Sequence, residues 1–194
     1  MTARIVVGIS GASGALVAVE VLKLLNRTEA ETHLVVSKWG AVTLEHECGL
    51  KARDLYPLVS AVHSDRDLAA PISSGSFRCD ATVVVPCSAR TLGAIASGSG
   101  DTLISRAADV AIKERRRLVL GLREAPLSSI HLRNALTLSD AGAVIYPLVP
   151  TFYAKPENIS SLVSDVAARL VELCGIATDA LPRWGETVDL TAGT

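Results

Sequence analysis

Two turns in the sequence carry groups that could bind a phosphate or a similar anion. The first is the segment 8–14, GISGASG, which follows an apolar run and opens a helical pattern. Free backbone N–H groups and the helix dipole favour an anion at such a position, and Ser13 adds a hydroxyl donor. The glycines are spaced by three, so the segment is not the GxGxxG fingerprint of dinucleotide-binding proteins. Phosphate binding and a tight turn that needs glycine only for its backbone geometry both remain open.

The second turn, PCSART at 86–91, follows another apolar run. Open α/β sheets bind ligands at the carboxyl ends of their strands, so the hydroxyls of Ser88 and Thr91 and the amides from 88 to 91 are candidate phosphate ligands. Either hydroxyl would equally serve as the cap of the next helix. Cys87 is expected to be a small buried thiol rather than a nucleophile, because no sequence signature pairs it with a base.

A basic helix is the third candidate. Arg106, Asp109 and Lys113 are spaced i, i+3 and i+7 and should therefore share one helical face. The arginine run 115–117 is expected to be a solvated helix end.

Other candidates are single residues. Arg123 and Glu124 directly follow a buried apolar run, where a charged pair is either a structural ion pair or part of a site. Glu47 lies in LEHEC, which lacks the HExxH spacing of a zinc site, and the histidines are scattered, so we expect no metal. Tyr153 lies in a loop, and Arg169 lies in the last helix, where the alternative is an exposed charge.

These candidates are positioned by apolar runs that alternate with helical patterns. Strands are expected at 4–9, 32–37, 81–85, 118–122 and 143–146, the third of them halted by Pro86. Helices are expected at 17–26, 38–47, 91–97, 103–115, 129–139 and 158–174. Strands rich in Val, Ile and Leu that alternate with helices predict an α/β fold, a Rossmann-like or flavodoxin-like three-layer sandwich with a mainly parallel sheet.

The chain is expected to form one domain over 1–194, with a C-terminal tail from about 185, because no linker or repeat interrupts it. The segment 64–78 is expected to be a long loop. Hydrophobic residues make up 49% of the chain, which is enough for a substantial core, and the net charge of −1 argues against non-specific nucleic-acid binding. No apolar run reaches the roughly 18 residues of a membrane span. The cysteines form no CxxC pair and no secretory leader is recognised, so we expect reduced thiols in a cytoplasmic protein.

Taken together, the motifs resemble those of the flavin prenyltransferase family, the helper enzymes of reversible aromatic-acid decarboxylases. The resemblance runs from about residue 8 to residue 184. Its motifs are GISGASGA at 8–15, SSGSF at 73–77, VVPCSARTLGAIASG at 84–98, ISRAADVAIKERRRLVL at 104–120, REAPLSSIHL at 123–132, FYAKP at 152–156 and LPRWGE at 181–186.

The resemblance implies a single flavin-binding domain of Rossmann-like fold, a homododecamer, and the transfer of a dimethylallyl group from dimethylallyl monophosphate to N5 and C6 of reduced FMN. The prenylated FMN would serve a UbiD-type decarboxylase, and no magnesium would be needed. The residues implied to hold FMN are Gly11, Ala12, Ser13, Ser37, Ser88, Ala89, Arg90, Thr91 and Arg123.

By the same resemblance, the phosphate of the prenyl donor would be bound by Arg106, Lys113, Tyr153 and Arg169, partly from neighbouring subunits. Cationic and phenolic donors suit the phosphate that leaves when an allylic monophosphate ionises. The catalytic residues would be Ser13, Glu47, Lys113 and Glu124. The two glutamates match acidic active-site positions and are expected to move protons. Trp184 would help to close the site.

The chain departs from some relatives at Leu68 and Ala69, where they carry a tryptophan, and its loop over 50–72 is shorter; Trp39 could partly replace the missing aromatic wall. One rival is an FMN-dependent cysteine decarboxylase, but that group relies on a PxMN motif and the only methionine here is Met1. The other rival is a non-catalytic FMN-binding accessory subunit of a phenolic acid decarboxylase complex.

Overall fold

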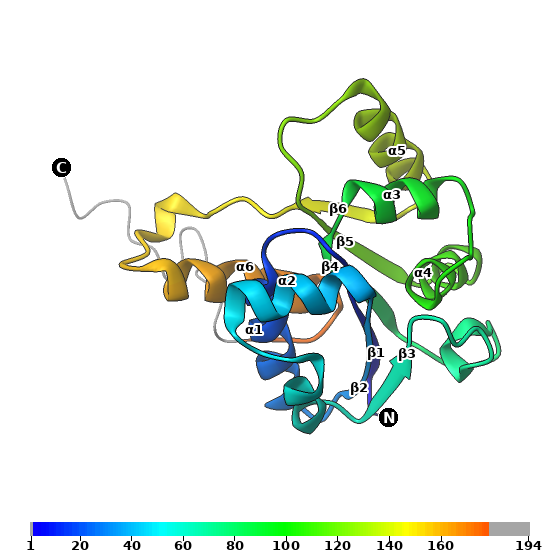
Figure 1. The fold of residues 1–194 in the computed structure, drawn as a ribbon, viewed down its shortest axis with the longest axis horizontal. Helices are drawn as coiled ribbons and strands as arrows, with labels where there is room; N and C mark the ends of the chain where they lie inside the picture. The colour runs from blue at the N-terminus through cyan, green and yellow to red at the C-terminus, as the bar shows by residue number, and fades with distance from the viewer. Residues whose placement is uncertain (1, 179–194) are drawn as a thin grey trace.

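A sheet of six parallel strands forms the centre of the computed structural model, which describes residues 2–178 (Figure 1). The strands are β1 Arg4–Ile9, β2 Glu31–Val36, β3 Ala61–Ser64, β4 Ala81–Cys87, β5 Arg117–Leu122 and β6 Val144–Pro147. Their order is β3-β2-β1-β4-β5-β6, and every neighbouring pair is parallel. The expected α/β fold with a Rossmann-like or flavodoxin-like sheet is confirmed.

Helices cover both faces of this sheet, which gives the three layers visible in Figure 1. They are α1 Ala15–Asn26, α2 Lys38–Cys48, α3 Ala89–Ala96, α4 Leu103–Lys113, α5 Ser129–Asp140 and α6 Ile159–Leu173. One core joins α1 and α6 to strand residues such as Ile5 and Val7, and a second joins α3 and α4 to residues such as Val6 and Val84. Because adjacent strand residues face opposite layers and both layers are apolar, the central strands are buried along their length.

Most helices begin at a local capping signal. Helices α2 to α6 each follow a serine, threonine or asparagine whose side chain accepts a hydrogen bond from an N–H group in the first turn. Helix α1 is different because its N-cap is Gly14, which has no side chain to offer. The first N–H groups of α1 therefore need an acceptor other than an N-cap side chain.

The segment between α2 and β4 is more ordered than the sequence indicates. The 3-10 helix η1 (Ala52–Leu58) and the edge strand β3 come first, and β3 ends at Ser64, where the expected loop begins. The expected loop 64–78 itself contains a second 3-10 helix, η2 (Pro71–Ser73). Strand β3 was missed because it is short and alternates half-buried with exposed residues, so it has no continuous apolar run. The loop after it is bound to α4, where Asp65 accepts hydrogen bonds from Leu103 N and Ile104 N.

Pro86 does not halt the third predicted strand. Strand β4 continues to Cys87, although its register with β5 shifts between Val84 and Cys87. Proline lacks an N–H group, and this irregular end of the strand does not require one. The Pro86 carbonyl is used instead, as an acceptor for Ser10.

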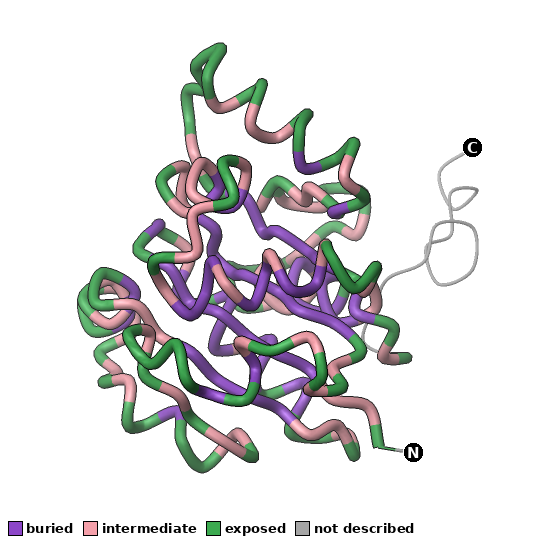
Figure 2. Tube along the Cα trace, turned by 90° about the vertical axis from the view of Figure 1, so that its right-hand side faces the viewer, coloured by how far each residue is buried: buried purple, intermediate pink, exposed green. Residues whose placement is uncertain are grey.

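Helix α5 stands out from the rest of the molecule, with Leu138 as its one buried residue (Figure 2). Large apolar side chains are exposed on and beside this helix, among them Ile130, Leu132 and Leu136. The segment from β6 to α6 extends away from the sheet in Figure 1 and exposes Phe152 and Ile159 to 72% and 73%. Several exposed large apolar side chains on neighbouring parts of the chain are typical of an interaction surface.

Candidate active site

The order of the strands reverses between β1 and β4, and a crevice for ligands is expected outside their carboxyl ends. Ser10 joins the two turns that line this position. Its hydroxyl donates to the Pro86 carbonyl at 2.8 Å and accepts the Ser88 N–H at 2.8 Å. Ser10 is only 1% exposed. The sequence did not single out Ser10, because a serine in a glycine-rich turn has the appearance of a solvated residue.

Glu47 provides the acceptor that α1 lacks. Its side chain comes from the last turn of α2, and one carboxylate oxygen accepts the N–H of Gly14 at 2.9 Å and of Ala15 at 2.8 Å. Burial pushes the pKa of Glu47 upward, but hydrogen bonds from Ser13 and from these N–H groups, together with the charge of Arg123, outweigh burial and hold the pKa below its usual value. Glu47 is therefore an ionised carboxylate at the positive end of the α1 dipole.

This contact bears on the question left open for the first turn. The anion at the start of α1 is a carboxylate of the chain itself, so the N–H groups of Gly14 and Ala15 are already used. Ser13 remains exposed beside Glu47, and Ala12 is buried.

Gly11 is required by a close approach. A β-carbon at this position would lie 2.4 Å from Cβ of Trp39, in the first turn of α2. The turn after β1 therefore packs directly against the start of α2. Trp39 is 59% exposed at this edge.

The second turn uses its hydroxyls for capping. Ser88 Oγ accepts the Thr91 N–H at 3.2 Å and lies 3.0 Å from Thr91 Oγ1. Ser37 caps α2 in the same way by accepting the Gly40 N–H. In such helices the first N–H groups have no intrahelical acceptor, so the amides of Ala89 and Arg90 remain suited to an anionic ligand.

Arg123 and Glu124 follow β5 at the same edge of the sheet. The Arg123 N–H donates to the Cys87 carbonyl at 3.0 Å, which holds this segment beside the second turn. The guanidinium charge is close enough to lower the pKa of Glu47. The Glu124 carboxylate accepts the N–H of Ala125. Arg123, Ser13 and Glu47 thus come together from three segments that are far apart in the sequence.

Cys87 is fully buried beside this edge, and burial raises the pKa of its thiol to about 12. A thiol with such a pKa is neutral at physiological pH and is no nucleophile. The prediction of a small buried thiol is confirmed.

The basic face of α4 lies elsewhere. Arg106 pairs with Asp109 at 2.7 Å and donates to the Ser73 carbonyl at 3.1 Å, while Lys113 pairs with Glu114 at 2.6 Å. A β-carbon on Gly75 would lie 2.6 Å from Lys113 Nζ, so Lys113 and Arg106 contact the same segment, as expected for one helical face.

This face is separated from Glu47 within one chain. Helix α4 runs back from the carboxyl edge of the sheet, and its last residue, Lys113, lies just before the start of β5 at Arg117. Lys113 is therefore near the amino edge, opposite the edge that carries Glu47 and Arg123.

The prediction that the run 115–117 is a solvated helix end is wrong for Arg116. Its guanidinium is largely buried and donates to the carbonyls of Gly75 and Phe77 at 2.7 and 2.8 Å. Arg115 and Arg117 are exposed as expected. The sequence could not identify the segment 73–77 as the acceptor for Arg116, because the backbone carbonyl of any residue can accept a hydrogen bond.

A third polar group gathers at β6 and α6. Burial raises the pKa of Tyr146, the nearby charge of Arg169 lowers it, and Tyr153 raises it, so these three side chains are electrostatic neighbours. The Arg169 guanidinium also forms an ion pair with Glu172. The sequence missed Tyr146 because it lies inside a strand. Trp184 and the predicted tail lie outside the described residues.

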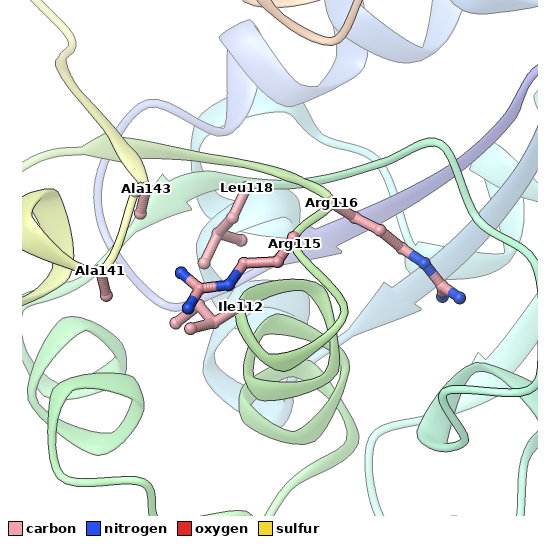
Figure 3. Close-up of a pocket in the computed structure, with 7 residues that line it drawn as sticks. Ile112, Arg115, Arg116, Leu118, Ala141 and Ala143 are labelled. Atoms are coloured by element: carbon pink, nitrogen blue, oxygen red, sulfur yellow. The ribbon is translucent and has the colours of Figure 1, made fainter.

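A small hollow of about 140 Å³ lies at the amino edge, away from these groups (Figure 3). It is lined by Ile112, Arg115, Arg116, Leu118, Ala141, Gly142 and Ala143. Among residues 2–178, no three His, Cys, Asp or Glu side chains are grouped closely enough to hold a metal ion. None of the helices in this part of the chain is both long and apolar enough to cross a bilayer.

Comparison with known proteins identifies the family. The model of the Flavoprotein family matches residues 1–190. The mitochondrial flavin prenyltransferase of Saccharomyces cerevisiae is 48% identical over 181 residues, which cover 93% of this chain and 75% of that protein.

Two solved structures are also similar. The UbiX protein PadA1, in complex with FMN and dimethylallyl pyrophosphate, is 50% identical, with a TM-score of 0.93 over 95% of this chain and 98% of that chain. A dodecameric FMN-dependent UbiX-like decarboxylase from Escherichia coli O157:H7 is 46% identical, with a TM-score of 0.91 over 93% and 98% of the two chains. High identity along nearly the whole length agrees with the ordered motifs. The chain belongs to the flavin prenyltransferases of the Flavoprotein family.

Proposed function

We propose that this protein joins the dimethylallyl group of dimethylallyl monophosphate to N5 and C6 of reduced FMN and releases prenylated FMN. The observation that carries the proposal is the group formed by Ser13, Glu47 and Arg123 at the reversal point of the sheet. The ionised carboxylate and the hydroxyl suit a proton transfer, and the cation, held beside the start of α3, suits a flavin phosphate.

The residues at the carboxyl edge fit FMN. The amides of Ala89 and Arg90 and the charge of Arg123 suit the flavin phosphate, while the exposed Gly11 backbone and Ser37 offer polar groups to the rest of the molecule. Reduced flavin supplies the electron-rich N5 and C6 atoms that form the new bonds.

Glu47 is the proposed acceptor for the proton that leaves C6. A carboxylate with a lowered pKa is a weak base, but the proton would leave the tetrahedral C6 of a positively charged ring system, so a weak base is sufficient. Ser13 orients the carboxylate, and the N–H groups of Gly14 and Ala15 hold it in place. Glu124 is proposed to pass a proton to the departing phosphate.

The phosphate of the prenyl donor is proposed to bind Arg106, Lys113, Tyr153 and Arg169. Breaking the allylic C–O bond leaves the electron pair on the phosphate, and these donors stabilise the charge that develops there. Since Lys113 lies near the amino edge of its own sheet, it can reach a site of this kind only in another subunit. The exposed apolar residues of α5 and of the segment before α6 support such an assembly, and we propose the dodecamer seen in the Escherichia coli relative.

We further propose a single flavin-binding domain over 1–194, a cytoplasmic location, and delivery of the product to a UbiD-type decarboxylase. The donor is proposed to be the monophosphate, although the solved relative contains the pyrophosphate. Comparing the two donors in the assay below decides between them.

The test is anaerobic incubation of the purified protein with reduced FMN and dimethylallyl monophosphate, followed by mass spectrometry of the released flavin. The wild type is expected to yield a flavin heavier by one prenyl unit. Lys113→Ala should lower the rate by about 100-fold or more, because a charge-assisted contact to the leaving group is lost. Lys23→Ala is the matched control, since Lys23 also forms an ion pair with a neighbouring glutamate on a helix surface.

Unmodified FMN recovered from a protein that binds flavin tightly would overturn the transferase. It would favour the alternative, a non-catalytic FMN-binding accessory subunit of a phenolic acid decarboxylase complex. Under that alternative, Lys113→Ala and Lys23→Ala would behave alike in every assay.

A further inference from the structure

The hydroxyl of Ser10 has two hydrogen bonds that both lead to the second turn. It donates to the Pro86 carbonyl and accepts the Ser88 N–H, each at 2.8 Å, and the Ser10 N–H also reaches the Pro86 carbonyl at 3.3 Å. These contacts join residues 76 and 78 positions apart in the sequence. With an exposure of 1%, the hydroxyl has no access to solvent and is unlike the exposed Ser13 three residues later.

The hydrogen bonds of Ser10 lie where the pairing of two strands has ended. Strands β1 and β4 pair from Ile5 to Gly8 on β1, so the regular ladder has ended before Ser10 is reached. Beyond that point the side chain of Ser10 replaces the ladder and holds the ends of the two strands together. This is the edge of the sheet at which the flavin is proposed to bind.

The Ser88 N–H lies immediately before the amides that remain for a ligand. Ser10 withdraws this N–H from the crevice by accepting it, and Ser88 in turn caps α3. The hydrogen bonds of Ser10 therefore also set the direction in which the amides of Ala89 and Arg90, one and two residues further on, point. A displaced turn would move both donors together.

We propose that Ser10 is a positioning residue for the flavin site, whose buried hydroxyl fixes the start of α3 relative to the turn after β1. The proposal rests on the proposed function in so far as the ligand is FMN. Ser10 itself touches no reacting atom and acts through the backbone of residues 86–88. Removing its hydroxyl leaves a partly buried N–H group without its acceptor, a loss that costs more than a solvated hydrogen bond.

The test measures the Kd for FMN by quenching of flavin fluorescence, together with the Tm of each variant. Ser10→Ala is expected to raise the Kd about tenfold or more. Ser10→Thr and Ser10→Val form a second comparison, because the two side chains have the same shape and differ in the hydroxyl. The threonine variant should bind FMN several-fold more tightly than the valine variant.

Ser105→Ala is the matched control. Ser105 is also buried, at 2%, and its hydroxyl donates to the Thr102 carbonyl at 3.0 Å in the capping box of α4. It should lower the Tm by a similar amount without weakening FMN binding. A Kd for Ser10→Ala within twofold of the wild type, or an equal weakening by Ser105→Ala, would overturn the proposal.

If Ser10→Ala does not fold, the comparison of Ser10→Thr with Ser10→Val tests the proposal instead. Equal Kd values of these two variants for FMN would contradict a positioning role. Lys113→Ala separates this inference from the reaction itself, because it should slow prenyl transfer and leave the FMN Kd unchanged. Failure of the wild type to bind FMN would instead overturn the proposed function.

Discussion

At the scale of single residues, the ionisation of Glu47 depends on neighbours that come from distant segments. Ser13 and the N–H groups of Gly14 and Ala15 belong to the turn after β1, and Arg123 follows β5. Together they overcome the effect of burial and lower the pKa of Glu47. The same carboxylate therefore stabilises the start of α1 and remains ready to accept a proton.

This arrangement predicts a stability that depends on pH. Because the pKa of Glu47 in the folded chain lies below its unfolded value of about 4.3, its contribution is present above that value and is lost as the pH falls through the folded pKa. Glu47→Gln keeps an acceptor oxygen but removes the charge, so it should destabilise the protein by about 1 kcal/mol at pH 7. The difference should shrink in acid. Urea unfolding of both proteins at about pH 7 and about pH 3.5 measures it.

Glu45→Gln is the control, because Glu45 is an exposed carboxylate on the same helix. It should be indistinguishable from the wild type at either pH. The interpretation of Glu47 would be wrong if its glutamine variant were equally destabilised at both pH values.

At the scale of elements, the edge strand β3 depends on a polar network rather than on apolar packing. His33 of β2 is buried, and its ring nitrogens lie 2.9 Å from His63 of β3 and 2.9 Å from Glu31. Glu31 in turn binds Arg4 at 2.8 Å, and the His33 ring packs edge-on against Phe77. The loop before β4 and the strands β1, β2 and β3 are thus linked through one buried imidazole.

The network predicts that β3 loosens in mild acid. Burial lowers the pKa of His63, the neighbouring His33 lowers it further, and Asp67 partly opposes them. The unfolded chain then binds more protons than the folded chain between this lowered pKa and about 6.5, so stability falls as the pH drops through that window. Hydrogen exchange of the β3 amides should quicken between about pH 7 and pH 5.5, beyond the intrinsic change of exchange rate.

His63→Gln should reduce this dependence on pH, since glutamine can hydrogen-bond but does not titrate in the window. His46→Gln, on the exposed side of α2, serves as the comparison and should retain it. If the His63→Gln variant had the same pH dependence as the wild type, groups other than His63 would be responsible for the faster exchange of the β3 amides.

At the scale of the whole molecule, the predicted site residues fall into groups that one chain does not bring together. Glu47 and Arg123 lie at the carboxyl edge, whereas Lys113 lies near the amino edge against Gly75. The proposed assembly would unite them, and the exposed apolar residues of α5, such as Ile130 and Leu136, are the surface that we propose for it.

Shared sites predict complementation between inactive variants. Glu47→Gln and Lys113→Ala should each be inactive alone, but subunits mixed before assembly should regain activity at roughly one quarter of the sites, where each residue comes from an intact copy. Prenyl transfer by co-expressed variants, compared with variants mixed after assembly, measures this. Absence of activity in a confirmed mixed oligomer would mean that both residues serve the site of their own chain.

Much of this protein is determined by local sequence. The alternation of apolar runs with helical patterns is a property of consecutive residues, so five strands, six helices and the parallel sheet followed from it. Ser88 was recognisable as a candidate helix cap for the same reason, since it stands between a strand and the helix that it caps. The ordered motifs likewise pointed to the family.

Only the tertiary structure decided how the segments meet. The acceptor for the start of α1 comes from Glu47 at the end of α2, and the partner of Ser10 lies 78 positions away at Ser88. Neither contact leaves a local pattern, because either partner would look the same in isolation. Strand β3 and the position of Lys113 were also decided by the tertiary structure. The short, half-exposed strand β3 exists only through its pairing with β2. The edge of the sheet at which Lys113 lies depends on the direction in which α4 crosses the sheet.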